Sequence, residues 1–371
     1  MTRNYDNYIK IQNRNGKVWL LPQYNLDRAL HLYQPSSIRG KALKRYLPLG
    51  LKIIILKGIV KKILKIQDCT LEMDSRIDEI IRGIFGQGNL VYSCFLGTPS
   101  KHQKETIQIT SLNNIVGYCK VTNNKEVTNL FIQEKKILDR LDECGVENVP
   151  RCLWCEEMED GTAVFVQNTK KNCNSKVIQK ITNMHLDFLC ELASKTKQQC
   201  NYLLSDYYIM LRCFEKNICI LEKMGYDKEV LEKAILIVEN ELKNCNSFSV
   251  YHGDFTPWNT FEQGTGIYAF DFEYAKETYP PCLDIFHFFS QSLIYKKRMT
   301  AKKMFRVFET ELITKTNGQI FHNIYCAYLQ YLLHIIAFYI ERDKDEMKKD
   351  DLHCVSIWYE IILCILDSGK V

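Results

Sequence analysis

The chain has 371 residues, of which 46% are hydrophobic and 25% are charged. This composition is typical of a globular protein with two or three structural units, and it excludes the disordered and fibrous classes. The formal net charge is +5, but residues 1–65 contain fourteen Lys and Arg against only two acids. Such an excess of one sign is typical of a segment that faces an anionic surface.

The sequence predicts a cytoplasmic protein. No apolar run reaches about 18 residues without a charge, so no membrane-spanning helix is expected. The first ten residues are polar and lack the apolar core of a signal peptide. Without an export signal, the sixteen cysteines are expected to be reduced thiols rather than disulfides.

Residues 1–75 are predicted to form a basic N-terminal extension. Within it, the segment 51–66 has lysines that recur at every fourth position, with isoleucine and leucine on the opposite face. This pattern indicates a basic amphipathic helix. Two interpretations stay open: the helix docks on an anionic membrane surface, at the inner face of the membrane, or it packs on the protein with its lysines in solvent. No nucleic-acid motif accompanies the segment, so no nucleic-acid partner is expected.

From about residue 88 the pattern changes to strands. Strands are predicted at 90–96, 106–110, 115–121, 152–157 and 162–167, with a helix at 125–144 between the third and the fourth. The remainder is mostly helical, over 174–245 and 300–371. This order predicts an α+β protein with two lobes: a small antiparallel sheet lobe at 76–170 and a mainly helical lobe at 171–371.

The stretch at 250–284 carries the candidate chemistry. It reads VYHGDFTPWNTF from Val250, then IYAFDFEYA from Ile267, and then YPPCLD ending at Asp284. Two short strands, at 248–251 and 267–270, place their polar side chains on loops and strand ends. The oxygen atoms of Asp254, Asn259 and Asp271 suit a hard cation such as Mg²⁺. A carboxylate beside such an ion can orient a hydroxyl nucleophile and accept its proton.

HGDFTPWN followed by FDFE resembles the aminoglycoside phosphotransferase/choline kinase family of small-molecule kinases, whose loop reads H-G-D-x-x-x-x-N and whose metal strand ends in D-[FW]-E. The resemblance implies a protein-kinase-like fold, ATP and Mg²⁺. It also implies that Asp254 is the catalytic base and that Asn259 and Asp271 are metal ligands. Gly253 replaces the arginine of the protein-kinase H-R-D motif, which favours the small-molecule branch. His252 and Asp284 are expected to support the loop.

The resemblance also implies a phosphate-binding lysine in the N-terminal half. Lys120 ends the third predicted strand, and its expected partner is Glu134, the acid on the otherwise apolar stripe of the following helix. Glu126 is the alternative partner, although it lies where acids are favoured at any helix start.

Nucleotide contacts are expected at two further places. The backbone between Gly97 and His102, at Thr98 and Ser100 in particular, would cover the phosphates. The adenine would contact the end of the fifth strand, from Val166 to Asn168.

The resulting functional hypothesis is a phosphotransferase with a nucleotide and a small-molecule or saccharide acceptor as its partners. Two alternatives stay open: a nucleotide-binding pseudokinase or scaffold, and a protein kinase, against which the missing arginine and glycine-rich loop count. Trp258, Phe272 and Tyr274 could box a quaternary ammonium group, but such aromatic residues are more often part of a core. The acceptor itself is not readable from the sequence.

Overall fold

The computed structural model describes residues 2–13, 15–33, 38–52, 61–62, 66–97, 103–172, 174–296, 298–316, 320–343 and 347–371. The chain divides into two compact units. Unit 1 comprises Met1–Asp139 and Val149–Ser175, and unit 2 comprises Arg140–Asn148 and Lys176–Val371. The predicted α+β class, with an antiparallel sheet in one part and mainly helices in the other, is confirmed.

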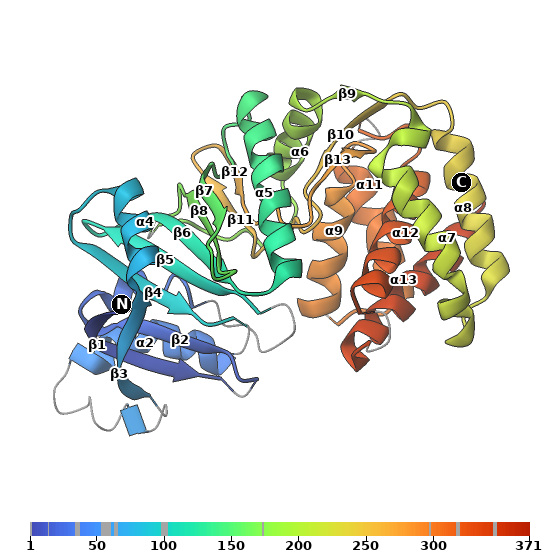
Figure 1. Ribbon diagram of the computed structural model, residues 1–371. Coiled ribbons are helices and arrows are strands. Elements are labelled where there is room, and N and C mark those ends of the chain that lie inside the picture. The colour runs from blue at the N-terminus through green and yellow to red at the C-terminus, as the bar shows by residue number, and fades with distance from the viewer. Residues whose placement is uncertain are drawn as a thin grey trace. The chain divides into compact units, whose positions relative to one another are not determined.

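Unit 1 is built on one eight-stranded sheet with the order β3-β1-β2-β4-β5-β6-β8-β7 (Figure 1). Every pair of neighbouring strands in it is antiparallel. The strands are β1 Thr2–Gln12, β2 Val18–Pro22, β3 Gln67–Asp74, β4 Leu90–Phe95, β5 Glu105–Ser111, β6 Asn114–Thr122, β7 Cys152–Glu157 and β8 Ala163–Asn168. Its helices are α1 Leu26–Ala29, α2 Ile38–Lys52, α4 Ser75–Phe85 and α5 Lys125–Glu143, with a 3₁₀ turn η1 at Gln23–Asn25. The five strands and the helix predicted between residues 90 and 167 are confirmed within two residues at each end.

The structure corrects the prediction for residues 1–75, which are not a separate extension. They supply β1, β2 and β3, and β2 pairs directly with β4 through Trp19 and Leu20. Tyr8 is fully buried and donates a hydrogen bond from its hydroxyl to the carbonyl oxygen of Tyr92, 2.9 Å away. The outer strands therefore share the apolar core of the predicted nucleotide lobe.

The predicted helix at 51–66 lies mostly outside the described residues. Only its first two positions, which end α2, and residues 61–62 and 66 are described. Ile66 is buried in a second apolar cluster of unit 1, with Trp19 and Leu47 among its members.

Unit 2 is mainly helical. Its helices are α6 Asn183–Lys195, α7 Asp206–Lys223, α8 Lys228–Leu242, α9 Asp284–Gln291, α10 Ala301–Val307, α11 Ile313–Thr316, α12 Ile324–Asp343 and α13 Lys349–Ser368. A 3₁₀ turn, η2 Tyr202–Leu204, precedes α7, and π-helical turns η3 Ser292–Lys296 and η4 Phe308–Leu312 follow α9 and α10. Two small antiparallel ladders complete it: β13 Lys276–Tyr279, β10 Ser247–Tyr251 and β9 Gln198–Gln199 in one, and the hairpin β11 Thr260–Gln263 with β12 Gly266–Ala269 in the other.

Helix α12 is the centre of unit 2 and packs against α7, α8, α9 and α13 (Figure 1). Its segment Ile324–Arg342 is long and apolar enough to cross a membrane by composition, but 83% of that segment is buried inside the structure. An apolar helix that is covered on most sides by other helices is a core helix. The described cysteines are free thiols, as predicted.

Candidate active site

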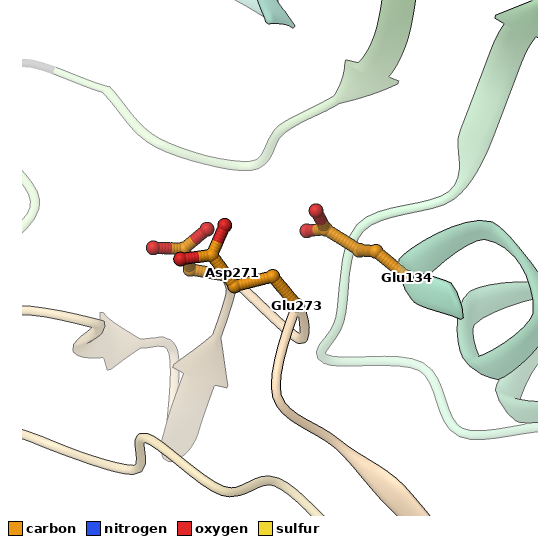
Figure 2. Close-up of side chains that lie close together, drawn as sticks. All are labelled: Glu134, Asp271 and Glu273. Atoms are coloured by element: carbon orange, nitrogen blue, oxygen red, sulfur yellow. The ribbon is translucent and has the colours of Figure 1, made fainter. Parts of the chain in front are cut away.

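In unit 1, Lys120 and Glu134 form a buried ion pair. The ammonium Nζ of Lys120 lies 2.7 Å and 3.0 Å from the two carboxylate oxygens of Glu134. Lys120 stands in β6, and Glu134 projects from α5 (Figure 2). Lys120 is 5% exposed and Glu134 is fully buried. The predicted pairing is therefore confirmed, and Glu134 rather than Glu126 is the partner.

The surroundings of Lys120 hold its ammonium in one place. Its strand pairs with β5 on one side and β8 on the other, where Phe165 is its partner in register. The ammonium also lies 5.4 Å from the centre of the Phe165 ring, which is within the range of a cation–π contact. A cation fixed by a bidentate carboxylate and an aromatic face is preorganised to meet a second anion.

The other predicted nucleotide contacts are placed differently. Thr98 and Ser100 lie outside the described residues. Val166 pairs with β6 and with β7, so its backbone is engaged inside the sheet rather than free for a nucleotide. Asn168 lies at the strand end, where its side-chain oxygen accepts a hydrogen bond from the backbone N–H of Arg151 at 2.7 Å. The backbone N–H of Asn168 is engaged as well, because it donates a hydrogen bond to the carbonyl oxygen of Arg151 at 3.2 Å.

In unit 2, the carboxylate of Asp254 is held by two side chains. Asn259 donates from Nδ2 to Oδ2 of Asp254 at 2.7 Å, and His287 lies 3.1 Å from Oδ1 through Nε2. The Asp254 side chain is 31% exposed, so part of it still reaches solvent. Partial burial raises the pKa of Asp254, and the hydrogen bonds from His287 and Asn259 offset only part of that rise. A carboxylate oriented in this way can accept a proton from a bound hydroxyl group.

The backbone of the loop that carries Asp254 is held by hydrogen bonds to Asp284. This buried residue at the start of α9 accepts hydrogen bonds from the backbone N–H groups of His252 at 2.9 Å and Gly253 at 3.1 Å. Burial raises the pKa of Asp284 to about 7, although both hydrogen bonds favour its ionised form. Asp284 thus acts on the loop backbone and holds it in place.

His252 connects the loop to the strand end before Asp271. Its Nδ1 accepts the backbone N–H of Asp254 at 3.2 Å, so Nε2 carries the proton and donates to the carbonyl oxygen of Phe270, also 3.2 Å away. Burial lowers the pKa of His252 to about 4, and the ring is therefore neutral near pH 7. These are the contacts of a structural residue rather than of a proton donor.

Gly253 explains why the loop has glycine at its second position. Its φ is +84°, a left-handed conformation that L side chains rarely adopt. A Cβ built there would lie 2.5 Å from the backbone carbonyl oxygen of Tyr274. An arginine at this position, as in H-R-D loops, would therefore collide with the segment that follows Asp271.

Asp271 and Glu273 bring two carboxylates to the turn after β12 (Figure 2). A carboxylate oxygen of each lies within 4.8 Å of the other, a spacing that one cation can bridge. Asp271 has φ +72°, an uncommon value for a residue other than glycine, and such backbone strain occurs often at functional sites. Glu273 completes the D-F-E motif and is a candidate ligand that the sequence motifs did not single out.

The donor set fits a magnesium ion. Asn259 uses its amide nitrogen for Asp254, to the side chain at 2.7 Å and to the backbone oxygen at 3.1 Å, which leaves the amide oxygen as the group that can bind a cation. With the carboxylate of Asp271, this gives a small set of oxygen ligands of the kind that Mg²⁺ prefers.

His287 is a site residue that sequence reasoning missed. It lies one helical turn after Asp284 in α9 and is almost buried. Since a carboxylate only accepts hydrogen bonds, Nε2 donates to Asp254, and Nδ1 lies 3.2 Å from the hydroxyl of Tyr331 in α12. The sequence places His287 three residues after Asp284, and therefore on nearly the same face of a helix. Only the packing of α9 on α12 shows that this face meets the Asp254 loop.

A pocket of about 220 Å³ opens in front of Asp254, within unit 2. Its lining combines the catalytic-loop residues and His287 with aromatic side chains and one arginine from α12. The lining residues are Gly253, Asp254, Trp258, Tyr274, His287, Gln291, Tyr295, Phe338, Tyr339 and Arg342. Of the three aromatic residues considered as a cation box, Phe272 is buried in the core, while Trp258 and Tyr274 line this pocket.

The fold and the site define an α+β protein with a buried Lys–Glu pair on its sheet and an Asp-centred polar cluster in its helical unit. No family model matches the sequence, and no curated protein matches it. The structure is similar to that of a thermostable mutant of an aminoglycoside phosphotransferase, with 9% identity, 79% of this chain and 98% of that chain covered, and a TM-score of 0.49.

Two choline kinases are also similar in structure. The enzyme from Streptococcus pneumoniae shares 15% identity over 79% of this chain and 98% of that chain, with a TM-score of 0.48. The enzyme from Cryptosporidium parvum shares 12% identity over 80% of this chain and 98% of that chain, also with a TM-score of 0.48.

Proposed function

We propose that the chain is a phosphotransferase that moves the γ-phosphate of ATP, in the presence of Mg²⁺, to a hydroxyl group of a small molecule or saccharide. The observation that supports this function best is the environment of Asp254. Its carboxylate faces a pocket and is oriented by Asn259 and His287, on a loop whose backbone Asp284 holds. Phosphoryl transfer needs positioning and charge neutralisation more than covalent chemistry.

In this mechanism, Asp254 accepts a hydrogen bond from the acceptor hydroxyl and takes its proton as the hydroxyl oxygen bonds to the γ-phosphorus. The bond from this phosphorus to the oxygen bridging the β- and γ-phosphates breaks in the same step, and ADP leaves. Its raised pKa makes it a better base than an ordinary aspartate. Lys120, which Glu134 holds in one place, would neutralise phosphate oxygens. Asn259 and Asp271 would hold Mg²⁺, which when bound neutralises charge on the phosphates.

The test is the substitution Asp254→Asn, which keeps the shape of the side chain and removes its basicity. We expect kcat for phosphate transfer to fall by about 10²–10⁴-fold, while ADP still raises the melting temperature as it does in the parent chain. The matched control is Asp367→Asn, at an exposed aspartate of α13, which should change neither quantity.

Three outcomes would contradict the proposal. An Asp254→Asn variant with an unchanged kcat would remove this residue from the role of base. A parent chain that binds Mg-ATP but transfers no phosphate to any acceptor would instead be a nucleotide-binding pseudokinase or scaffold, and transfer to polypeptides alone would make it a protein kinase.

We also propose that the enzyme works in the cytoplasm, at the inner face of the membrane if segment 51–66 docks there. Flotation of the full-length chain with anionic vesicles, compared with neutral ones, tests the docking. Equal recovery with both kinds of vesicle would dismiss it.

A further inference from the structure

The pocket in front of Asp254 contains a positive charge of its own, supplied by Arg342. This arginine is in the last turn of α12, and its side chain is 29% exposed. The guanidinium carbon lies 4.3 Å from the centre of the Tyr339 ring and 5.5 Å from that of Phe338. Stacking on two rings fixes the planar group, which carries five N–H donors suited to a carboxylate or phosphate.

This arrangement argues against a cationic acceptor. A quaternary ammonium group is bound by the open faces of aromatic rings, but the guanidinium of Arg342 already lies over Tyr339 and Phe338. A second cation in the pocket would also meet like-charge repulsion, which is an effective means of rejecting a ligand. We therefore expect the pocket to bind choline-like compounds poorly.

The remaining lining indicates the shape of the ligand. Trp258 and Tyr295 meet edge to face at 6.4 Å, and Tyr274 and Phe338 do so at 5.0 Å, so rings of several orientations surround the space. At about 220 Å³, the pocket lies below the range of roughly 300–1,000 Å³ that is typical of sites for drug-sized ligands. It suits one small ring rather than a chain of several.

The pocket wall carries one negative group and one positive group, each from a different residue. Asp254 offers a carboxylate to a hydroxyl group, and Arg342 offers a guanidinium. Tyr274 lies within electrostatic reach of both groups. Asp351 of α13 holds the guanidinium from outside the lining, with its carboxylate 3.3 Å from the Arg342 nitrogen. A ligand with a hydroxyl at one end and an anionic group at the other would satisfy both residues.

We infer that the acceptor is a single-ring hydroxyl compound that carries a carboxylate or phosphate group, and that Arg342 binds this group. The inference rests on the proposed phosphotransferase function. Arg342 is then the residue that selects acceptors by their charge, while Asp254 acts on the acceptor hydroxyl.

The experiment uses ligands that differ in charge but share one ring: glucuronate and glucose 6-phosphate as anions, glucose as the neutral compound, and glucosamine as the cation, with choline added. Binding to the full-length chain with Mg-ADP is measured by calorimetry, and phosphate transfer from ATP is measured for each compound. We expect the anions to bind best, and glucosamine and choline worst. Carboxylate and phosphate are separate arms of the panel.

Substitutions of opposite effect separate a ligand contact from a structural role. Arg342→Gln should weaken binding of the anions about tenfold or more, with an effect on glucose below about threefold, because a charge-assisted hydrogen bond is lost. Asp351→Asn should strengthen anion binding several-fold, because it removes the carboxylate that competes for the guanidinium. Arg306→Gln, at an exposed arginine of α10, is the matched control and should change neither.

The inference is overturned if glucosamine or choline binds best, or if no anion binds the parent chain more tightly than the Arg342→Gln variant. Failure of the proposed function would look different. In that case the chain would neither bind nor turn over Mg-ATP, while the order of ligand binding would still report on Arg342.

Discussion

Lys120 and Glu134 carry their charges where almost no water reaches them. Glu134 is fully buried, and the Lys120 side chain is 7% exposed. Removing both ions from water has a large desolvation cost, which only close, well-aligned contact offsets. The pair is therefore a poor way to stabilise a sheet, and its presence is better explained by a need for a fixed cation.

The first prediction concerns this pair. Glu134→Gln removes the carboxylate that pairs with the buried ammonium of Lys120, so we expect a loss of about 3–5 kcal/mol in the free energy of unfolding. Lys125→Met breaks the exposed pair with Glu157, whose side chains are 70% and 38% exposed, and should cost less than about 1 kcal/mol. Urea unfolding of both variants measures the difference.

The double variant Lys120→Met with Glu134→Leu supplies the control for this argument. It removes both charges, so its stability should exceed that of Glu134→Gln. A double variant that is less stable than the single one would show that the pair itself stabilises the fold.

At the same scale, the sequence predicts some site residues because their relations are local. Asp254 and Asn259 share one loop, and Lys120 and Glu134 lie on adjacent elements. Once the family resemblance had suggested the roles, spacing and the apolar stripe of the helix were enough to locate the residues. Arg342 could not be predicted in this way. It is far along the chain, and only the packing of α12 brings it to the pocket of Asp254.

At the scale of elements, the loop at Gly253 and the turn after β12 form one tightly packed unit. The Tyr274 carbonyl fills the space that a Cβ at Gly253 would need, and His252 bonds to the carbonyl of Phe270. The two loops are therefore in direct contact, and we expect a substitution that displaces one of them to displace the other.

The second prediction follows from this close packing. Gly253→Ala must both adopt φ +84° and displace a backbone atom 2.5 Å away. Gly225→Ala has φ +91° but open space around its Cβ, so it isolates the backbone strain of about 1–2 kcal/mol. We expect Gly253→Ala to lose about 1–3 kcal/mol more than this control and to lower kcat. Thermal unfolding and a transfer assay measure both, and equal losses would contradict the packing argument.

The outer strands of unit 1 show why sequence patterns failed for residues 1–75. Lysine and arginine are frequent there, and their summed charge suggested a segment that faces an anionic surface. In β1, however, Tyr8, Ile9 and Ile11 are buried, and the charged neighbours occupy the remaining positions. The basic surplus is thus compatible with a half-buried strand. Net charge alone did not distinguish such a strand from a separate basic segment.

For the whole molecule, the contacts of β1, β2 and β3 indicate that residues 1–75 are needed for folding. Asp78 in α4 is fully buried, and its carboxylate accepts hydrogen bonds from Tyr5 at 2.8 Å, Tyr92 at 2.7 Å and Arg82 at 2.9 Å, and also pairs with Arg3. Two of these four partners come from β1. Without these two partners, the buried Asp78 carboxylate would lose part of the hydrogen bonding and charge pairing that offset its desolvation. Such a loss is strongly destabilising.

The last prediction is that a chain that starts at residue 76 does not fold as unit 1 requires. The truncation removes β2, which pairs with β4, and so leaves β4 as an open edge of the sheet. Exposed apolar edges promote aggregation. The truncation would also remove Tyr8, Leu71 and Met73 from the main apolar cluster. We expect the truncated chain to aggregate in size-exclusion chromatography and to lose the thermal shift with ADP. A monomeric 76–371 chain with the parent melting temperature would show instead that residues 1–75 are dispensable. Any test of membrane docking by segment 51–66 should for the same reason use glutamine substitutions of its lysines in the full-length chain.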